Sequence, residues 1–298
     1  MIAILGGLGA AALWAAANLA SSRSSRLIGA SSTVAWMMLV GLAVTTPFAA
    51  VSGPLPPITP MLAVWLVASG LGGVIGLLLV YRGLRIGKIG VVLALASTEG
   101  AIAALLSVVA GEALTLASAV VLGVIAIGVM TVALASGGAA EPTGVDAGAG
   151  AILGPRTGLS LERRAAFFGA AAAIAFGFSI YGTAMAGKSL PLVLAVMPAR
   201  VVGVGFVFIP MAFARRLQMT RRAAPLVVIV GLGEVLGNAS YILGSRESIA
   251  VASVLASQFA AFAAVAAFFL FRERLSLPQR SGFVAIAVGV AILTVVRS

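Results

Sequence analysis

The stretch SAVVLGVIAIGVMTVALA, from Ser118 to Ala135, runs for 18 residues without a charged side chain. It also lacks the alternation of polar and apolar residues that is typical of the strands of an outer-membrane barrel. About 20 apolar residues are needed to cross a bilayer as an α-helix. This stretch therefore predicts a membrane-spanning helix.

Similar stretches fill most of the chain, which has 298 residues, of which 61% are hydrophobic and 9% charged. A soluble domain has about a quarter of its residues charged. The first segment has no basic residues before its apolar run, so we interpret it as a span and not as a signal peptide. We predict an all-α membrane protein with ten transmembrane helices, at residues 2–20, 31–51, 61–81, 88–109, 113–134, 165–186, 191–213, 225–243, 249–271 and 278–296.

One polar stretch divides these spans into two sets of five. Residues 136–164 are rich in glycine and contain Glu141, Asp146 and Glu162, a composition typical of a hydrated linker. The predicted domains are therefore a first five-helix repeat at residues 1–135, a cytoplasmic linker at 136–164 and a second five-helix repeat at 165–298.

The two halves also resemble each other in sequence. An offset of 161 places Gly70-Leu-Gly-Gly-Val-Ile-Gly76 on Gly231-Leu-Gly-Glu-Val-Leu-Gly237, and further along it places Glu112 on Glu273. Because each copy has an odd number of spans, the second copy must enter the membrane in the opposite orientation. We therefore predict two inverted repeats.

The basic residues support that orientation. The predicted loops place 15 Lys and Arg residues on one side of the membrane and three on the other, with Arg200 inside a span. Basic loops stay in the cytoplasm, so we predict that the linker is cytoplasmic and that both termini lie outside. The net charge of +11 is then a topology signal, and no nucleic-acid partner is expected.

The sequence resembles the EamA-type branch of the drug/metabolite transporter superfamily. The resemblance rests on ten spans in two inverted copies and on the E-x-L-[TS] turn after the fourth span of each copy, at Glu112 and Glu273. It implies transport of small organic molecules, such as amino acids, metabolites and drugs, often outward. It also implies a cavity formed mainly by spans one, three and four of each copy. The better-known ten-span members have cytoplasmic termini, whereas the charge count here predicts the reverse.

Few polar side chains lie at membrane depth, where each is energetically costly. The candidates for contact with a substrate or a coupling ion are Glu99, Glu234, Arg200, Asn238, Gln258, Trp14 and Tyr181. The two acids either line a central cavity and carry protons, or one of them forms a structural ion pair with Arg200. Structural pairing and recognition of an anion are equally compatible with Arg200.

The remaining features have local interpretations. Trp14, Asn18, Tyr181 and Tyr241 are cavity walls or interfacial anchors, and for Tyr241 we favour the anchor. We expect Glu112 and Glu273 to cap the helix that follows each of them, or Glu273 to pair with Arg280. Gly-rich faces in spans three and eight favour close helix packing. We expect the prolines of span seven to kink it, and Gln258 to occupy the repeat position of Ser97.

Several function classes are disfavoured. The chain has no Cys and no His, which removes thiolate and imidazole chemistry, so we expect no enzyme, metal or cofactor. A literal P-loop match, GTAMAGKS at Gly182–Ser189, ends a predicted span where no nucleotide site is expected. The sequence predicts a secondary transporter that exports small organic metabolites such as amino acids or drugs, with proton coupling through an intramembrane acid. We expect it in a cell membrane or cell inner membrane, as a monomer or homodimer. A scaffold or sensor and a membrane-embedded enzyme are the alternatives.

Overall fold

The structure is a computed structural model that describes residues 1–53, 56–84, 86, 89–136, 159–259, 261–263, 265–266 and 276–296. Within these ranges the chain forms helices and no strands. The first half contains α1 (Ile2–Ile28), α2 (Ala30–Ala50), α3 (Pro60–Leu84), α4 (Ile89–Ala96), α5 (Glu99–Val109) and α6 (Leu116–Ser136). The second half contains α7 (Leu159–Ser189), α8 (Leu192–Gly203), the π-helical turn η1 (Val204–Phe208), α9 (Ile209–Phe213), α10 (Ala223–Ser245), α11 (Ile249–Ala256) and α13 (Leu277–Val296).

The helices have the length and composition of membrane spans. Eight of them, over the described residues, are apolar for at least 18 residues. The other two predicted segments contain shorter apolar helices, Leu116–Val132 and Ile249–Ala263. The protein is therefore a multi-pass membrane protein, and the count of ten spans stays a prediction.

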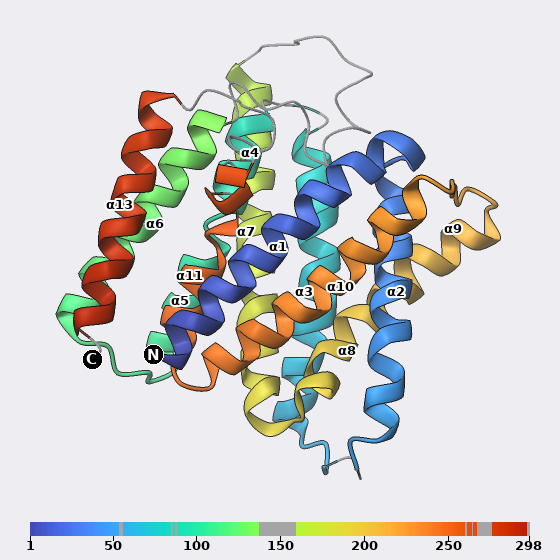
Figure 1. Cartoon of the computed structure of the whole chain (residues 1–298), viewed down its shortest axis with the longest axis horizontal. Coiled ribbons are helices and arrows are strands. Elements are labelled where there is room, and N and C mark those ends of the chain that lie inside the picture. The colour runs from blue at the N-terminus through green and yellow to red at the C-terminus, as the bar shows by residue number, and fades with distance from the viewer. Residues whose placement is uncertain are drawn as a thin grey trace.

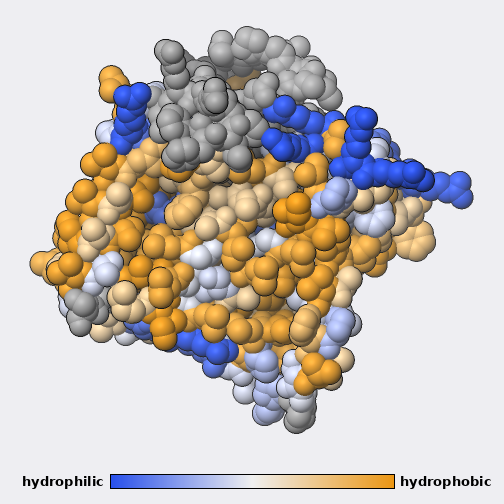
Figure 2. Space-filling view, viewed as in Figure 1, coloured by the Kyte–Doolittle hydropathy of each residue, from blue (hydrophilic) through white to orange (hydrophobic). Residues whose placement is uncertain are grey.

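The surface agrees with this assignment. Figure 2 shows a broad hydrophobic surface across the middle of the molecule, with hydrophilic side chains gathered at its upper and lower edges. Large apolar side chains such as Leu5, Val64, Ile127 and Phe178 are exposed along the helices. Lipid tails solvate such side chains, whereas water would not.

The helix ends define two faces of the molecule. In Figure 1 the N-terminus and the C-terminus lie together at the bottom, and the end of α6 and the start of α7 lie at the top. We call these the termini face and the linker face. The α7 helix begins at Leu159, inside the range predicted for the linker, and its first residues include Glu162, Arg163 and Arg164. Glu141, Asp146, Glu273 and several of the counted basic residues lie outside the described residues.

Each half packs mainly against the other half. The most extensive contacts join α3 to α7 and α1 to α10, followed by α6 with α13. Further contacts between the halves join α5 to α11, α5 to α7, α1 to α11, α2 to α10, α2 to α8 and α3 to α8. Exchanging the two halves reproduces this set of pairs, as an inverted repeat requires. The repeat itself remains a prediction that this pattern supports.

Repeat-related glycines have equivalent neighbours. A Cβ at Gly76 on α3 would lie 2.6 Å from the ring of Phe176, and a Cβ at Gly237 on α10 would lie 2.5 Å from the ring of Trp14. The two rings come from the first helix of the opposite half. These glycines therefore let an aromatic side chain press against a helix backbone at matching places in the two halves.

The fourth and ninth predicted spans are interrupted at mid-length. A turn at Ser97 and Thr98 separates α4 from α5, and a turn at Ser257 and Gln258 follows α11. The N–H of Thr98 donates to Leu95 O and that of Gln258 to Leu255 O, at 3.1 and 3.2 Å. Gln258 therefore matches Thr98 and not Ser97 as predicted, so the repeat register shifts by one residue before this turn.

The seventh span is helical throughout, with one irregular turn. Pro198 lies inside α8, and η1 follows before α9, which has Pro210 near its start. A π-helical turn is one recognised response to a disrupted hydrogen-bond ladder.

Candidate functional site

Arg200 and Glu234 form an ion pair between α8 and α10. The Nη2 atom of Arg200 lies 3.4 Å from Oε2 of Glu234, and its Nη1 lies 3.5 Å from the sulfur of Met38 on α2. Arg200 is 2% exposed and Glu234 is 25% exposed. The structure therefore pairs Arg200 with one of the two acids, which is one of the two alternatives that the sequence leaves open.

The position of Arg200 depends on a glycine of α2. A Cβ at Gly41 would lie 2.9 Å from Cδ of Arg200, so the missing side chain makes room for the arginine. The Nε atom of Arg200 is buried and has no hydrogen-bond partner within the described chain. One donor of a fully buried guanidinium is thus left unused, which is unusual in a folded protein.

Two further polar residues, Glu99 and Asn238, lie near Glu234 of the ion pair. Glu99 is the first residue of α5, directly after the mid-span turn, and lies within electrostatic range of Glu234. Asn238 donates to Glu234 O over 2.7 Å, so its amide nitrogen is used within its own helix. The structure therefore brings Arg200, Glu234 and Asn238 together, and it places Glu99 at the mid-span turn within electrostatic range of Glu234.

Gln258 lies at the mid-span turn after α11 and is fully buried. Its Nε2 donates to Val254 O over 3.3 Å, and its Oε1 has no partner within the described chain. Among the described residues, the Gln258 side chain bonds within its own turn and makes no hydrogen bond to Arg200 or Glu234.

Trp14 and Tyr241 lie against each other between α1 and α10. Their ring centroids are 6.2 Å apart, and the Nε1 of Trp14 is buried without a partner in the described chain. Tyr241 is 0% exposed, and its hydroxyl joins Ser253 Oγ at 2.8 Å and Ile180 O at 3.2 Å. The prediction that Tyr241 is an interfacial anchor is therefore wrong, because its hydroxyl is satisfied inside the protein.

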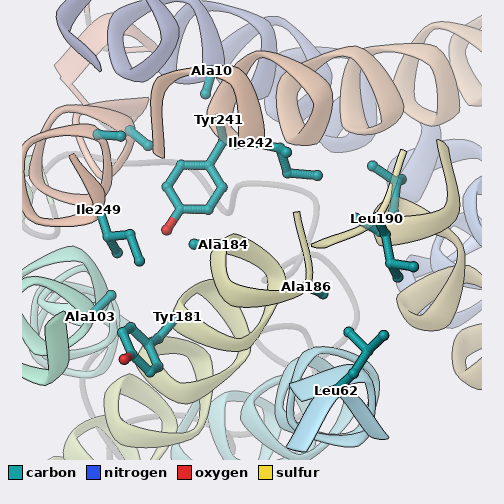
Figure 3. Close-up of a cluster of buried hydrophobic side chains, with 14 residues drawn as sticks. Ala10, Leu62, Ala103, Tyr181, Ala184, Ala186, Leu190, Tyr241, Ile242 and Ile249 are labelled. Carbon is teal, nitrogen blue, oxygen red and sulfur yellow. The ribbon is translucent and has the colours of Figure 1, made fainter. Parts of the chain in front are cut away.

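Tyr181 lies apart from the ion pair, on the side of α7 that faces α5. Figure 3 shows Tyr181 near Ala103, with Tyr241 on the neighbouring α10. Its ring meets that of Trp65 edge-on at 5.3 Å. Tyr181 therefore lines a wall, as predicted, but the wall belongs to a cavity closer to the termini face.

That cavity measures about 240 Å³ and opens between α5, α7 and the start of α11. It is lined by Ser107, Ala110, Gly111, Glu112, Tyr181, Met185, Lys188, Ser245, Glu247, Ser248 and Ile249. Glu247, one of the residues that line this cavity, accepts hydrogen bonds from the Met1 amine at 2.9 Å and the Ala3 N–H at 3.0 Å. The bond from the Met1 amine holds the pKa of Glu247 below its usual value.

Glu112 was expected to cap the helix that follows it, and this expectation is wrong. Its carboxylate instead accepts hydrogen bonds from the Ser248 hydroxyl, the Ile249 N–H at 3.1 Å and the Ala250 N–H at 3.3 Å, at the start of α11. The capped helix belongs to the other half of the chain. Sequence spacing cannot reveal this partner, because 137 positions separate Glu112 from Ile249.

Two further features lie near the ends of α7 and α10. The P-loop match at Gly182–Ser189 lies inside α7, and no loop is present there to cradle a phosphate. Arg246 donates to Gly187 O at 2.9 Å and Leu190 O at 3.2 Å. It thereby satisfies carbonyl groups at the end of α7, as basic residues at helix C-termini commonly do.

Comparisons with known proteins agree with the fold. Residues 1–134 match the sequence profile of the EamA-like transporter family, which confirms the resemblance over the first half. No curated protein sequence matches the chain. A solved structure titled "Crystal structure of protein" superposes with a TM-score of 0.74 at 17% identity, covering 99% of this chain and 97% of that one. At that identity the likeness shows a shared fold.

Proposed function

We propose that this protein, whose residues 1–134 match the EamA-like transporter family, is a secondary active transporter that exports small organic metabolites such as amino acids or drugs. The observation that carries the proposal is the mid-span cluster of Glu99 with the Arg200–Glu234 pair. Ionisable side chains at this depth mark substrate and ion pathways in membrane proteins.

The two acids of the cluster have different roles in this proposal. Glu234 is neutralised by Arg200. No ion pair joins Glu99 to a basic residue in the described chain, and Glu99 experiences the negative charge of Glu234. Protonation of Glu99 removes that repulsion, so Glu99 is the better candidate for carrying the coupling proton.

The same cluster favours a zwitterionic substrate. Glu99 offers a carboxylate to an ammonium group, and Arg200 has an unused Nε donor for a carboxylate. A substrate carboxylate binding to Arg200 would compete with Glu234, whose single 3.4 Å contact is long for a charge-assisted hydrogen bond. Amino acids and related metabolites carry both groups.

Alternating access would use the pairing of the two halves. The interrupted spans cross at the centre, where α5 packs against α11, and discontinuous helices at mid-membrane are typical of transporter binding sites. Rocking of one half against the other would open the linker face and the termini face in turn. We place the linker face in the cytoplasm and both termini outside, on the basis of the charge distribution.

Purified protein in liposomes tests this function. Counterflow of radiolabelled amino acids should exceed that of empty liposomes, and an imposed proton gradient should drive accumulation. Glu99→Gln should abolish the gradient-driven component and retain exchange. Glu162→Gln, which changes an acid at the start of α7 outside the predicted spans, is the matched control and should retain both activities. Gradient-driven accumulation that is unchanged in Glu99→Gln would remove Glu99 as the proton carrier.

A further inference from the structure

The Gly-Glu motif at Gly111 and Glu112 has no role in the proposed function, but it determines how the α5 helix ends. Gly111 has a φ of +100°, in the region that favours glycine. Its N–H donates to Val108 O at 3.0 Å, and the Glu112 N–H donates to Ser107 O at 2.9 Å. This pair of bonds is a Schellman motif, which ends the α5 segment and fixes the direction in which Glu112 leaves it.

Glu112 then reaches across to the second half of the chain. Its carboxylate accepts bonds from the Ser248 hydroxyl and from the first two N–H groups of α11. The Ser248 hydroxyl also accepts from the Val251 N–H at 3.3 Å. Glu112 and Ser248 together satisfy three N–H groups at the start of α11, and the negative charge faces the positive end of that helix dipole.

We propose that Glu112 is a positioning residue of the transport cycle, a latch that holds the termini face closed by tying α5 of the first half to α11 of the second. The inference rests on the proposed function for its purpose. Its structural basis is the contact itself and the cavity beside it, which is lined by Ser107 of α5 and Ile249 of α11.

The contact of Glu112 with α11 must break when the termini face opens between α5 and α11. The α5 helix of the first half packs against the α11 helix of the second half. In alternating access, a solute that leaves towards the termini face passes between the two halves. Separation of the two segments removes the carboxylate from the α11 N–H groups. Those groups then need water as a replacement partner, which the open, hydrated state of the cavity supplies.

A second contact between the halves supports the latch at the same face. Glu247, after α10, accepts from the Ala3 N–H at the start of α1. Glu247 is more exposed than Glu112 and accepts from the Met1 amine and the Ala3 N–H, whereas Glu112 accepts two backbone bonds and a hydroxyl bond. We therefore expect Glu112 to contribute the larger share of the closure.

The absence of cysteine from the sequence permits a direct test. A single Ser107→Cys reports on the cavity wall at the termini face, because Ser107 is 2% exposed. Ala165→Cys reports on the contact of α7 with α3 and α4 near the linker face, where Ala165 is 1% exposed. Detergent-solubilised protein is labelled with a water-soluble maleimide, so both faces are accessible and membrane orientation does not matter.

Glu112→Gln should raise the labelling rate of Ser107→Cys by about tenfold, the change expected when one charge-assisted hydrogen bond is lost, and leave that of Ala165→Cys unchanged. Gly111→Ala should act in the same direction by misdirecting Glu112. Lys188→Gln, on the same cavity rim, should change neither rate. An unchanged Ser107→Cys rate in Glu112→Gln, or an equal rise at both cysteines, overturns the latch.

Labelling does not require transport, so the two proposals fail separately. If counterflow is absent while Glu112→Gln still exposes Ser107→Cys selectively, the latch stands and the transport function is wrong. If counterflow is present and labelling does not respond, the function stands and the latch is wrong.

Discussion

Arg200 is 2% exposed and donates a hydrogen bond to Glu234 over 3.4 Å, between two helices of the second half. The equivalent positions of the first half, at the offset of 161, are Leu39 and Gly73. The ion pair therefore exists in one half alone. An otherwise symmetric pattern of helix contacts thus encloses an asymmetric charged cluster.

Removal of one partner should be more costly than removal of both. Arg200→Met leaves Glu234 without its counter-charge and should lower the stability by about 2–3 kcal/mol, below the range for fully buried pairs because Glu234 is partly exposed. The double variant Arg200→Met/Glu234→Gln should regain at least half of this loss. Thermal unfolding in detergent measures both, and a double variant that is less stable than Arg200→Met would show that the pair is not coupled.

The contact of α1 with α10 requires a glycine at position 6. A Cβ at Gly6 would lie 2.5 Å from the Cα of Gly244 and 2.7 Å from Ser240 O. Because these neighbours are backbone atoms, Gly6→Ala must push the helices apart and should cost about 1–3 kcal/mol.

Gly123 on α6 provides the matched control. No atom lies within 4 Å of a Cβ at that position, so Gly123→Ala should leave the stability unchanged or raise it by up to about 1 kcal/mol. Equal unfolding temperatures for the two alanine variants would contradict the close approach of α1 and α10.

Two tyrosines should respond differently to loss of their hydroxyl groups. Tyr241→Phe removes the bonds to Ser253 and Ile180 and should lower the stability by about 1–2 kcal/mol, because buried partners lose their bonds. Tyr181→Phe should leave the stability unchanged and alter solute uptake, since Tyr181 lines the cavity. The unfolding temperature measures the loss of stability, and the counterflow rate measures the effect on uptake. A Tyr181→Phe variant that is destabilised would contradict the placement of the Tyr181 hydroxyl in the cavity.

Reporter fusions test the topology in living cells. Because the two termini lie on the same face (Figure 1), reporters at both ends should give the same result and a reporter in the linker the opposite one. The charge distribution adds that a cytoplasm-specific reporter should be active in the linker and inactive at the termini. Activity at the C-terminus would overturn the orientation, and opposite results at the two termini would overturn the span count.

The membrane fold was predictable because hydropathy along the chain is a local property. The limits of α1, α2, α10 and α13 agree with the predicted spans to within a few residues, except that α1 continues to Ile28. Arg23 and Arg26, near its end, were assigned to a loop because of their charge. A helix that projects beyond the hydrocarbon can carry such residues, because their side chains reach the aqueous interface.

The candidate site was predictable only in part. Charge at membrane depth is rare, which makes Glu99, Glu234 and Arg200 recognisable as candidates, and the structure pairs Arg200 with Glu234. The stretches Leu95-Ala96-Ser97 and Leu255-Ala256-Ser257 match at an offset of 160. The offset of 161, which fits a longer part of the chain, therefore does not predict that the two turns are equivalent. The partner of Glu112 and the burial of Tyr241 depend on packing between distant segments, which no local pattern encodes.

The most direct test of the central claim is counterflow of labelled zwitterionic amino acids into liposomes that contain the purified protein, with and without a proton gradient. We predict accumulation above that of empty liposomes, driven further by the gradient in the natural sequence and not in Glu99→Gln. No accumulation above empty liposomes for any zwitterionic, cationic or anionic metabolite, with folded protein in the membrane, would contradict the account.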